Sequence, residues 1–298
     1  MCYVVFVKNY YPEIDVSLCT HCGLCIQACV AHAINPATMA INSNRCIACS
    51  HCSAICPVAA VKWPKANDEP DIPALADDVA DQLETLIKRR RSMRVFDRQA
   101  VPEGLINRIL ETVNHAPTGT NSRGVHVTVV RGEAEMKAMA DLTMSFFRRI
   151  ASLLLGPLGR PFLWLFGGQK MVRRIKGYKR HIDGYFTGKN ILTFDAPVLF
   201  VFSAHRKSSC PSQDAVIWAT TANLHAEALG LGTCYNGFIV LAASLYRPLR
   251  RYLGVPKGCK VYSTFLAGYP GLKYKRAAHR AACRHNFVSN QSDSHQKG

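Results

Sequence analysis

This 298-residue sequence has no uninterrupted apolar run of about 18 residues, the length that a transmembrane helix needs, so we expect no membrane-spanning helix. A short apolar run near the start, Tyr3 to Val7, has neither the basic flank nor the cleavage site of a signal peptide. We therefore expect a cytoplasmic protein, in which the scattered cysteines are reduced thiols: Cys2, Cys210, Cys234, Cys259 and Cys283.

Several catalytic motifs are also missing. The sequence contains no phosphate-binding G-x-x-x-x-G-K loop, no H-E-x-x-H zinc motif and no G-x-S-x-G nucleophile turn. Gly230 and Gly232 follow a helical pattern rather than a strand, and the third glycine of a dinucleotide-binding fingerprint is not at the right spacing. No dedicated acid–base pair is visible either, so these common reaction classes have no support in the sequence.

Acidic residues are absent from one long interval. Between Asp141 and Asp183 the sequence has no aspartate or glutamate, and the whole chain carries a formal net charge of +17. The interval contains nine cations: Arg148, Arg149, Arg160, Lys170, Arg173, Arg174, Lys176, Lys179 and Arg180. It lacks any recognisable nucleic-acid-binding motif, so we expect no nucleic-acid partner.

Cysteine, in contrast, is abundant. Eight of the 13 cysteines form two C-x2-C-x2-C-x3-C runs that lie 27 residues apart: Cys19, Cys22, Cys25 and Cys29, then Cys46, Cys49, Cys52 and Cys56. This spacing is typical of bacterial ferredoxins with two clusters, in which the fourth cysteine of each run ligates the other cluster. A zinc site would take two cysteine pairs separated by a longer loop, and a disulfide framework would suit a secreted domain, so both are weaker interpretations.

The spacing predicts two [4Fe–4S] clusters with crossed ligand sets. Cys19, Cys22, Cys25 and Cys56 would hold one cluster, and Cys46, Cys49, Cys52 and Cys29 the other. The repeat extends beyond the ligands, because Ile14 corresponds to Ile41 and Ile34 corresponds to Val61.

The rest of the chain is long enough for one sizeable domain of mixed helix and strand. We expect a cluster domain over 1–62, a proline-containing linker over 63–82 and a second domain over 83–298. Apolar periodicity predicts helices after Asp78 and Pro102 and over 134–147, 214–229 and 245–253, and strands over 125–130, 198–202 and 261–266. Helices and strands do not alternate regularly, which favours the α+β class.

Four segments of the second domain form a further pattern. They read R-R-S-M-R-V-F from Arg90, A-P-T-G-T-N-S from Ala116, G-L-G-T-C-Y-N-G from Gly230, and G-Y-P from Gly268 with K-Y-K-R from Lys273. In this order they resemble the nitroreductase family of FMN-dependent oxidoreductases, and more closely its branch with a fused N-terminal ferredoxin. Arg123, Tyr235 and Asn236 depart from the family's usual residues, which leaves the substrate preference open.

The resemblance implies a set of flavin contacts. Arg90, Ser92 and Arg276 would hold the FMN phosphate with Lys275 nearby, Arg91 would contact the ribityl chain, and Arg94 would face the pyrimidine edge. Asn121 would hydrogen-bond the ring edge, and Gly237 would offer its N–H near N5, flanked by Tyr235 and Asn236. Pro117, Thr118 and Gly119 would reach the flavin bound mainly by the other subunit of a homodimer.

The expected function is that of an iron–sulfur flavoprotein. Electrons would enter at the clusters, collect on FMN and pass to a small acceptor such as a nitroaromatic, a quinone or an activated C=C bond. Two alternatives remain open at this point. One is an NAD(P)H-driven reductase that passes electrons outward through its clusters, and the other is a non-catalytic electron carrier or redox sensor.

The basic and apolar segment 148–180 has three interpretations. The favoured one is a helical, lid-like insertion that covers the core or a cofactor. The second is a docking surface for an acidic electron carrier such as ferredoxin or flavodoxin, which this cationic segment would attract. The third and least favoured interpretation is contact with a membrane surface.

Overall fold

The computed structural model describes residues 11–64 and 72–288. Cys2, the run Tyr3 to Val7 and residues 65–71 of the expected linker lie outside this part of the chain.

Residues 11–64 form a small module of two matching halves. Strand β1 (Glu13–Ile14) pairs antiparallel with β2 (Val61–Lys62), which places Ile14 opposite Val61. The same pairing recurs between Ile34 and Ile41, the residues that correspond to them in the repeat. Each half also contributes one short helix, α2 (Leu24–Ala28) or α3 (His51–Ala54). The sequence repeat is therefore also a structural repeat.

The second domain is built on a four-stranded antiparallel sheet in the order β3-β4-β6-β5. Its strands are β3 (Val125–Arg131), β4 (Val198–His205), β5 (Gly232–Tyr235) and β6 (Cys259–Gly268). Alternate residues of β4 enter two different cores, Leu199 and Val201 on one face and Phe200 and Phe202 on the other. Burial on both faces explains why this strand is an unbroken apolar run.

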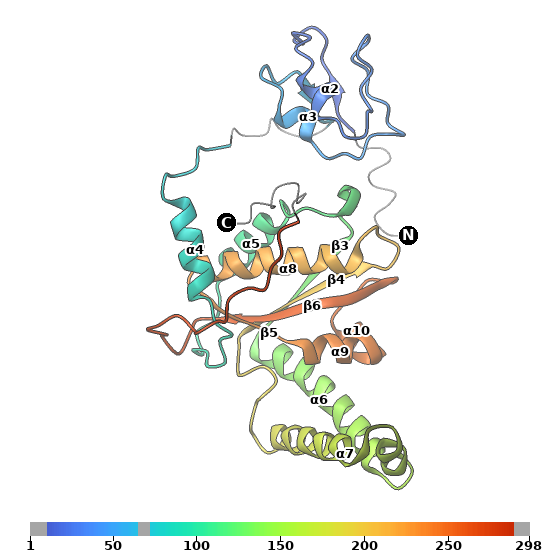
Figure 1. Cartoon of the computed structure of the whole chain (residues 1–298), viewed down its shortest axis with the longest axis vertical. Helices are drawn as coiled ribbons and strands as arrows, with labels where there is room; N and C mark the ends of the chain where they lie inside the picture. The colour runs from blue at the N-terminus through green and yellow to red at the C-terminus, as the bar shows by residue number, and fades with distance from the viewer. Residues whose placement is uncertain (1–10, 65–71, 289–298) are drawn as a thin grey trace, which may run out of the picture.

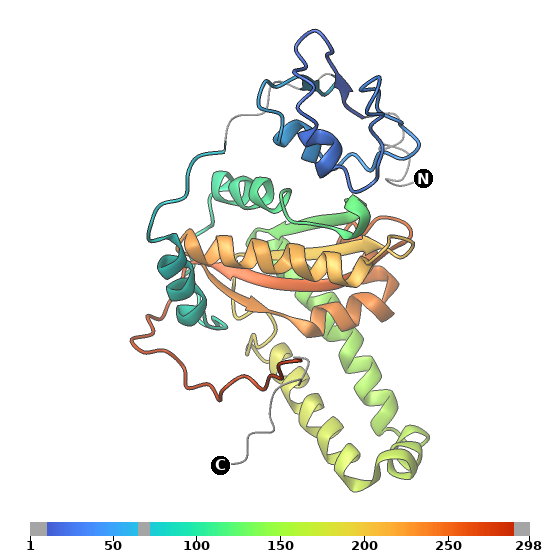
Figure 2. The ribbon, with the colours of Figure 1, turned by 45° about the horizontal axis from the view of Figure 1, so that its top comes forward.

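Helices cover both faces of this sheet (Figures 1 and 2). Helices α5 (Glu103–Val113) and α8 (Pro211–Ala228) pack on one face. Helices α6 (Glu133–Leu155), α9 (Gly237–Leu245) and α10 (Arg247–Tyr252) pack on the other. The α+β class is confirmed, and each helix and strand predicted from apolar periodicity is present.

Helix α4 (Val79–Arg89) has no buried residue, although its apolar side chains recur along one face. Val79, Leu83 and Ile87 are 38 to 53% exposed. The helix leads directly into the Arg90–Phe96 segment, so it positions one of the motifs recognised in the sequence.

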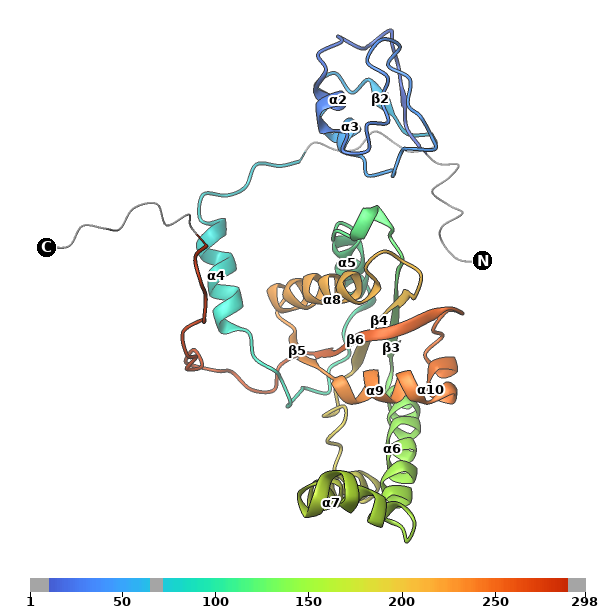
Figure 3. The same ribbon diagram turned by 45° about the vertical axis from the view of Figure 1, so that its right-hand side comes forward.

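The segment 148–180 belongs to a helical hairpin. Helix α6 continues into α7 (Gly159–Phe186), which changes direction at Gly168, where φ is 59°. The hairpin projects from the sheet at the end of the molecule opposite the cysteine-rich module (Figure 3). The segment is thus helical, as expected, whereas its role as a lid stays a prediction.

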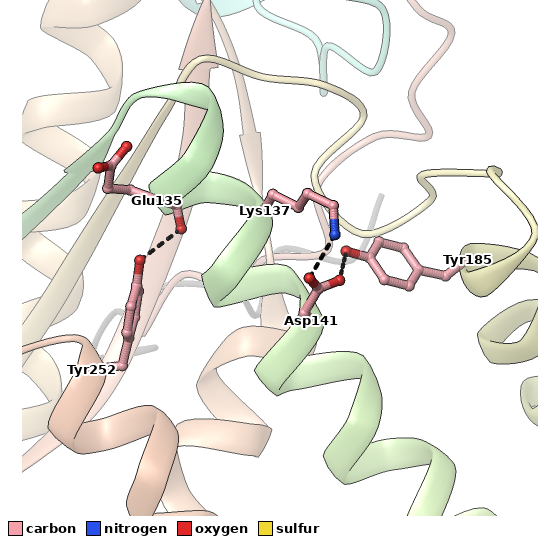
Figure 4. Close-up of polar contacts among 5 residues, drawn as sticks. All are labelled: Glu135, Lys137, Asp141, Tyr185 and Tyr252. Atoms are coloured by element: carbon pink, nitrogen blue, oxygen red, sulfur yellow. Dashed lines mark hydrogen bonds and ion pairs between the residues drawn. The ribbon is translucent and has the colours of Figure 1, made fainter.

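A carboxylate on α6 ties the two helices of this hairpin together (Figure 4). Tyr185 of α7 donates its hydroxyl to Asp141 Oδ1 at 2.7 Å, and Lys137 Nζ donates to Asp141 Oδ2 at 2.7 Å. Partial burial opposes ionisation of Asp141, but these two hydrogen bonds outweigh it and hold the pKa of Asp141 below its ordinary value. Nearby, Tyr252 donates to the backbone carbonyl of Glu135 at 3.0 Å.

Replacing Tyr185 with phenylalanine should lower the free energy of unfolding by about 1 kcal/mol at pH 7, because one hydrogen bond is lost. The lowered pKa of Asp141 means that its stabilising contribution is present above its ordinary value of 3.8 and is lost as the pH falls through the folded-state pKa. The difference in the free energy of unfolding between wild type and Tyr185→Phe should therefore become smaller in acid. Urea unfolding from pH 7 downwards measures it, with Tyr252→Phe as the matched control. Equal pH dependence in both variants would contradict this account.

Candidate functional site

The eight clustered cysteines line two cavities in the N-terminal module. One cavity is lined by Cys19, Cys22, Cys25 and Cys56. The other is lined by Cys46, Cys49, Cys52 and Cys29. Each cavity thus takes three cysteines from one run and the fourth from the other, the same two sets that the spacing predicts.

The backbone around both cavities is arranged to stabilise sulfur ligands. The first cysteine of each run accepts a hydrogen bond from the N–H two residues later, at 3.4 Å in both cases. The fourth accepts one from the N–H four residues later, at 3.3 Å in both. Left-handed φ values recur 27 residues apart, at His21 and Ala48 and at Gly23 and Ser50. Such turns direct N–H groups into an anion-binding concavity, as at many iron–sulfur sites.

The two sets of four cysteines suit a cluster of several irons and not a single metal ion. In the described ranges, no three His, Cys, Asp or Glu side chains converge as they would around a single metal ion. Four cysteines line each cavity instead. Burial also raises the pKa of Cys52 to about 11, so its thiolate needs the positive charge that iron would supply. The donor set and its spacing therefore suit two [4Fe–4S] clusters.

The loop of the second cavity contacts the second domain through Asn121. Asn121 donates its side-chain amide to the carbonyls of Ile47 at 3.0 Å and Ala48 at 2.8 Å. Ile47 and Ala48 lie between Cys46 and Cys49, which line that cavity. The sequence predicts a flavin contact for Asn121, and in this chain its amide nitrogen contacts the cysteine loop.

A buried carboxylate holds the turn that carries Asn121. Asp214 is 1% exposed, and its Oδ1 accepts the N–H of Gly119 at 2.8 Å. Its Oδ2 accepts the hydroxyl of Ser122 at 3.3 Å. Thr120 and Asn121 both have left-handed φ values, 53° and 50°, which are costly for residues with a side chain. Asp214 therefore stabilises a strained turn, and periodicity alone does not reveal this role.

Replacing Asp214 with alanine should lower the free energy of unfolding by about 2 to 3 kcal/mol, because the Gly119 N–H loses a charged acceptor. Asp214→Asn is the matched control, since its amide oxygen can still accept that N–H, and it should lose less than half as much. Urea unfolding curves of the full chain measure both. Equal losses would show that the Gly119 contact does not stabilise the turn.

The Arg90–Arg94 segment lies beside strand β5. Ser92 bridges to Thr233, and the Met93 N–H donates to the Thr233 carbonyl at 2.8 Å. Two of the four motifs recognised in the sequence thus meet in space. One guanidinium nitrogen of Arg90, Nη1, is buried and has no hydrogen-bond partner among the described residues. A buried guanidinium N–H group without a partner is what a bound phosphate would satisfy.

The Arg90–Arg94 segment and β5 together form a corner of the domain. A polar network behind β5 stabilises this corner. Glu227 accepts the N–H of Thr233 at 2.9 Å and its hydroxyl at 2.6 Å, and Asn223 donates to the same hydroxyl at 2.7 Å. Burial raises the pKa of Glu227, although the Thr233 hydrogen bonds and the charge of Arg90 oppose the rise. Asn223 and Glu227 stand in none of the four sequence motifs. The available signal is that Asp214 and Glu227 are the only acidic residues in the apolar helix α8.

Tyr235, Asn236 and Gly237 line an open groove between β5, α9 and the neighbouring end of β6. The Asn236 side chain caps α9 through the Ile239 N–H at 3.2 Å and donates to the Leu192 carbonyl at 2.6 Å. It therefore shapes the groove wall. Gly237 begins α9, and a Cβ built there would meet no atom within 4 Å. Its N–H forms no hydrogen bond within the described chain, so it remains available to a ligand.

The predicted flavin contacts fall into two separate groups in one chain. The turn with Pro117, Thr118, Gly119 and Asn121 lies at Asp214, whereas Arg90 and Ser92 lie near Glu227. Asp214 and Glu227 stand 13 positions apart on helix α8, which is a rise of about 20 Å. Arg91 bonds the carbonyls of Lys88 and Arg90, and Arg94 lies 6.0 Å from the Phe194 ring.

Lys275 and Arg276 are exposed on the segment that follows β6. This segment begins next to the Arg90–Phe96 strip, because Phe96 bridges to Pro270 and the Gly271 N–H donates to the Val95 carbonyl. Within the described residues, no hydrogen bond joins Lys275 or Arg276 to Arg90 or Ser92. Their phosphate role stays a prediction.

Comparisons with known proteins agree with this architecture. Residues 11–62 match the model of the 4Fe-4S dicluster domain, and residues 87–269 match the model of the nitroreductase family. The nitroreductase NfnB of Mycolicibacterium smegmatis is 28% identical over 186 residues, which cover 57% of this chain and 76% of that protein.

One solved structure shares the fold of the second domain. A nitroreductase with bound FMN from Desulfitobacterium hafniense is 22% identical, with a TM-score of 0.51 over 70% of this chain and 98% of its own. Another with bound FMN, from Bacteroides fragilis, is 21% identical, with a TM-score of 0.47 over 72% of this chain and 99% of its own. The nitroreductase model alone covers residues 87–269 of the 298, which is more than half of the sequence. The chain therefore belongs to the nitroreductase family, with a 4Fe-4S dicluster domain at its N-terminal side.

Proposed function

We propose that this protein is an FMN-dependent oxidoreductase in which two [4Fe–4S] clusters deliver electrons to the flavin and the flavin reduces a small acceptor. When bound, the clusters would carry single electrons and the flavin would combine them for a two-electron reduction. Nitroaromatics, quinones and activated C=C bonds are the proposed acceptors, in the cytoplasm.

The observation that carries this proposal is the contact of Asn121 with Ile47 and Ala48. It ties the loop of the second cysteine cavity to the turn that the family resemblance assigns to the flavin. Electron transfer from a cluster to a flavin requires that the two groups be close together. Asn121 belongs to the turn assigned to the flavin and contacts the cysteine loop, so it would keep them close.

The residues of the second domain would bind and orient the flavin. Arg90 and Ser92 would take its phosphate at the corner held by Glu227, and Gly237 would offer an open N–H in the groove. The roughly 20 Å between this corner and the Asn121 turn supports a homodimer, in which the turn of one chain approaches the corner of the other. The exposed apolar face of α4 would suit such an interface.

Anaerobic spectroscopy of the protein loaded with iron, sulfide and FMN tests the proposed direction. A reduced, acidic ferredoxin should bleach both the clusters and the flavin, and subsequent addition of a quinone or nitroaromatic should reoxidise them with turnover. Replacing Cys49 with alanine should block flavin reduction by ferredoxin while FMN stays bound. Rapid bleaching of the flavin by NADH alone would contradict the direction, and failure to turn over any acceptor would contradict the enzyme.

A further inference from the structure

The far end of the α6–α7 hairpin exposes large apolar side chains that no part of the described structure covers. Leu158, Phe162, Leu165 and Phe166 are 61 to 89% exposed, and Trp164 is 60% exposed. The residues at 158, 162, 165 and 166 recur at the spacing of one helical face. These side chains lie together on the short first part of α7, before the break at Gly168. Soluble proteins rarely expose so many large apolar side chains side by side unless the patch binds a partner or a membrane.

Positive charge surrounds this apolar face. Arg160, Arg173 and Lys176 line an open groove together with Leu155 and Trp164. Within the described chain, none of these three cations forms an ion pair, and the nearest acids in the sequence are Asp141 and Asp183. Asp183 is already paired with Lys179 at 2.6 Å. The groove therefore combines an apolar wall with uncompensated cations.

The helices of this hairpin suit binding to a membrane surface and not a path across the membrane. No single helix among the described residues is long and apolar enough to span a membrane, and only the pair 133–155 and 159–185, bent by 86°, passes the length and composition test. The part of α7 before Gly168 has nine or ten residues, about 14 Å, less than half of a hydrocarbon core of about 30 Å. A helix of this kind lies in the plane of the interface, with aromatic groups at headgroup depth.

We propose that the tip of the α6–α7 hairpin, residues 153–176, binds the surface of a membrane that contains anionic phospholipids. The apolar face of 158–166 would enter the boundary between headgroups and acyl chains. The cations of the groove would meet the lipid phosphates, and this charge complementarity selects an anionic bilayer over an uncharged one. The cluster module lies at the opposite end of the molecule and would face away from the membrane (Figures 1 and 3).

Co-sedimentation of the full-length, cofactor-loaded protein with vesicles tests this proposal. Vesicles of phosphatidylglycerol and phosphatidylcholine should bind the protein, and vesicles of phosphatidylcholine alone should bind it at least about tenfold more weakly, with the difference falling as salt is added. Trp164 should report insertion by a blue shift of its fluorescence, since Trp218 is buried in the core and Trp63 lies in the cysteine-rich module. Trp164→Phe should retain binding but lose most of this shift.

Two pairs of variants separate the tip from the rest of the surface. The double variant Phe162→Ser, Leu165→Ser should weaken vesicle binding at least about tenfold, and Arg173→Gln, Lys176→Gln should remove most of the preference for anionic lipid. The matched controls are Ile72→Ser, Leu75→Ser in the segment before α4, where both side chains are exposed, and Arg206→Gln, Lys207→Gln on the loop after β4. Neither control should alter binding.

Three results would overturn the proposal. The first is the absence of binding to anionic vesicles. The second is an equal loss of binding in the control variants, which would indicate nonspecific attraction. The third is a change of oligomeric state, or of affinity for an acidic ferredoxin, in the Phe162→Ser, Leu165→Ser variant with vesicle binding unchanged, which would assign the tip to a second copy or to a carrier protein.

Discussion

Replacing Arg90 with alanine is expected to weaken FMN binding about 10- to 150-fold, the equivalent of one charged hydrogen bond worth about 1.5 to 3 kcal/mol. The buried Nη1 of Arg90 has no partner within the described residues, so the guanidinium is held ready for an anion. Fluorescence titration of the apoprotein with FMN measures the change. Arg90→Lys should bind with intermediate affinity, because it keeps the charge but loses the planar fork.

Arg89 provides the matched control for this experiment. It is the neighbouring cation at the end of α4, and it is exposed. Arg89→Ala should bind FMN within about twofold of wild type. Removing Arg90 also removes the charge that opposes the raised pKa of Glu227, so thermal unfolding without FMN should be recorded for each variant. Normal FMN affinity in a folded Arg90→Ala protein would show that Arg90 does not bind the FMN phosphate.

Pairs of cysteine substitutions should distinguish crossed from uncrossed cluster ligation. If the ligand sets follow the two cavities, Cys29 and Cys46 serve the same cluster, whereas Cys29 and Cys19 serve different ones. The double variant Cys29→Ala, Cys46→Ala should then retain one cluster, with about four irons per chain. The double variant Cys19→Ala, Cys29→Ala should lose both clusters and nearly all of the iron.

Each of these double variants is the control for the other, because both remove two cysteines. Iron and sulfide analysis after anaerobic reconstitution gives the counts, and electron paramagnetic resonance of the reduced proteins shows whether the remaining cluster is intact. Uncrossed ligation predicts the opposite result, with the cluster retained in Cys19→Ala, Cys29→Ala. A similar loss of iron in both variants would mean that neither cluster forms alone.

The cysteine module could be interpreted from the sequence because short ligand spacings constrain the backbone directly. The 27-residue repeat appears in the structure as repeated N–H to sulfur hydrogen bonds and repeated left-handed turns. The long helix α8 and the strand β4 were predicted for a similar reason, since each buries a continuous apolar run. In these segments local pattern and tertiary packing agree.

Other elements gave no local signal. Strand β5 has only four residues and is held by β6 and by Glu227, so its pairing depends on distant parts of the chain. Helix α9 is apolar on nearly every side and lacks the amphipathic period that marks a surface helix. The contact of Asn121 with the Ile47 and Ala48 carbonyls joins residues more than 70 positions apart, and the sequence pattern does not indicate which loop meets which turn.

The residues expected to bind FMN could be predicted only in part, for the same physical reason. Recognisable motifs contain Arg90, Ser92 and Gly237. The carboxylates that stabilise the surrounding segments stand outside these motifs. Asp214 and Glu227 act through buried hydrogen bonds to backbone N–H groups of other segments. A carboxylate in an apolar helix is a useful signal of such a role, because burial without partners would be costly.

The central claim is that one chain holds two iron–sulfur clusters and a flavin. Anaerobic reconstitution of the full-length protein, followed by counts of iron, acid-labile sulfide, zinc and flavin, tests it most directly. We predict about eight irons, about eight sulfides and one FMN per chain. About two zinc ions per chain with no flavin would contradict the account.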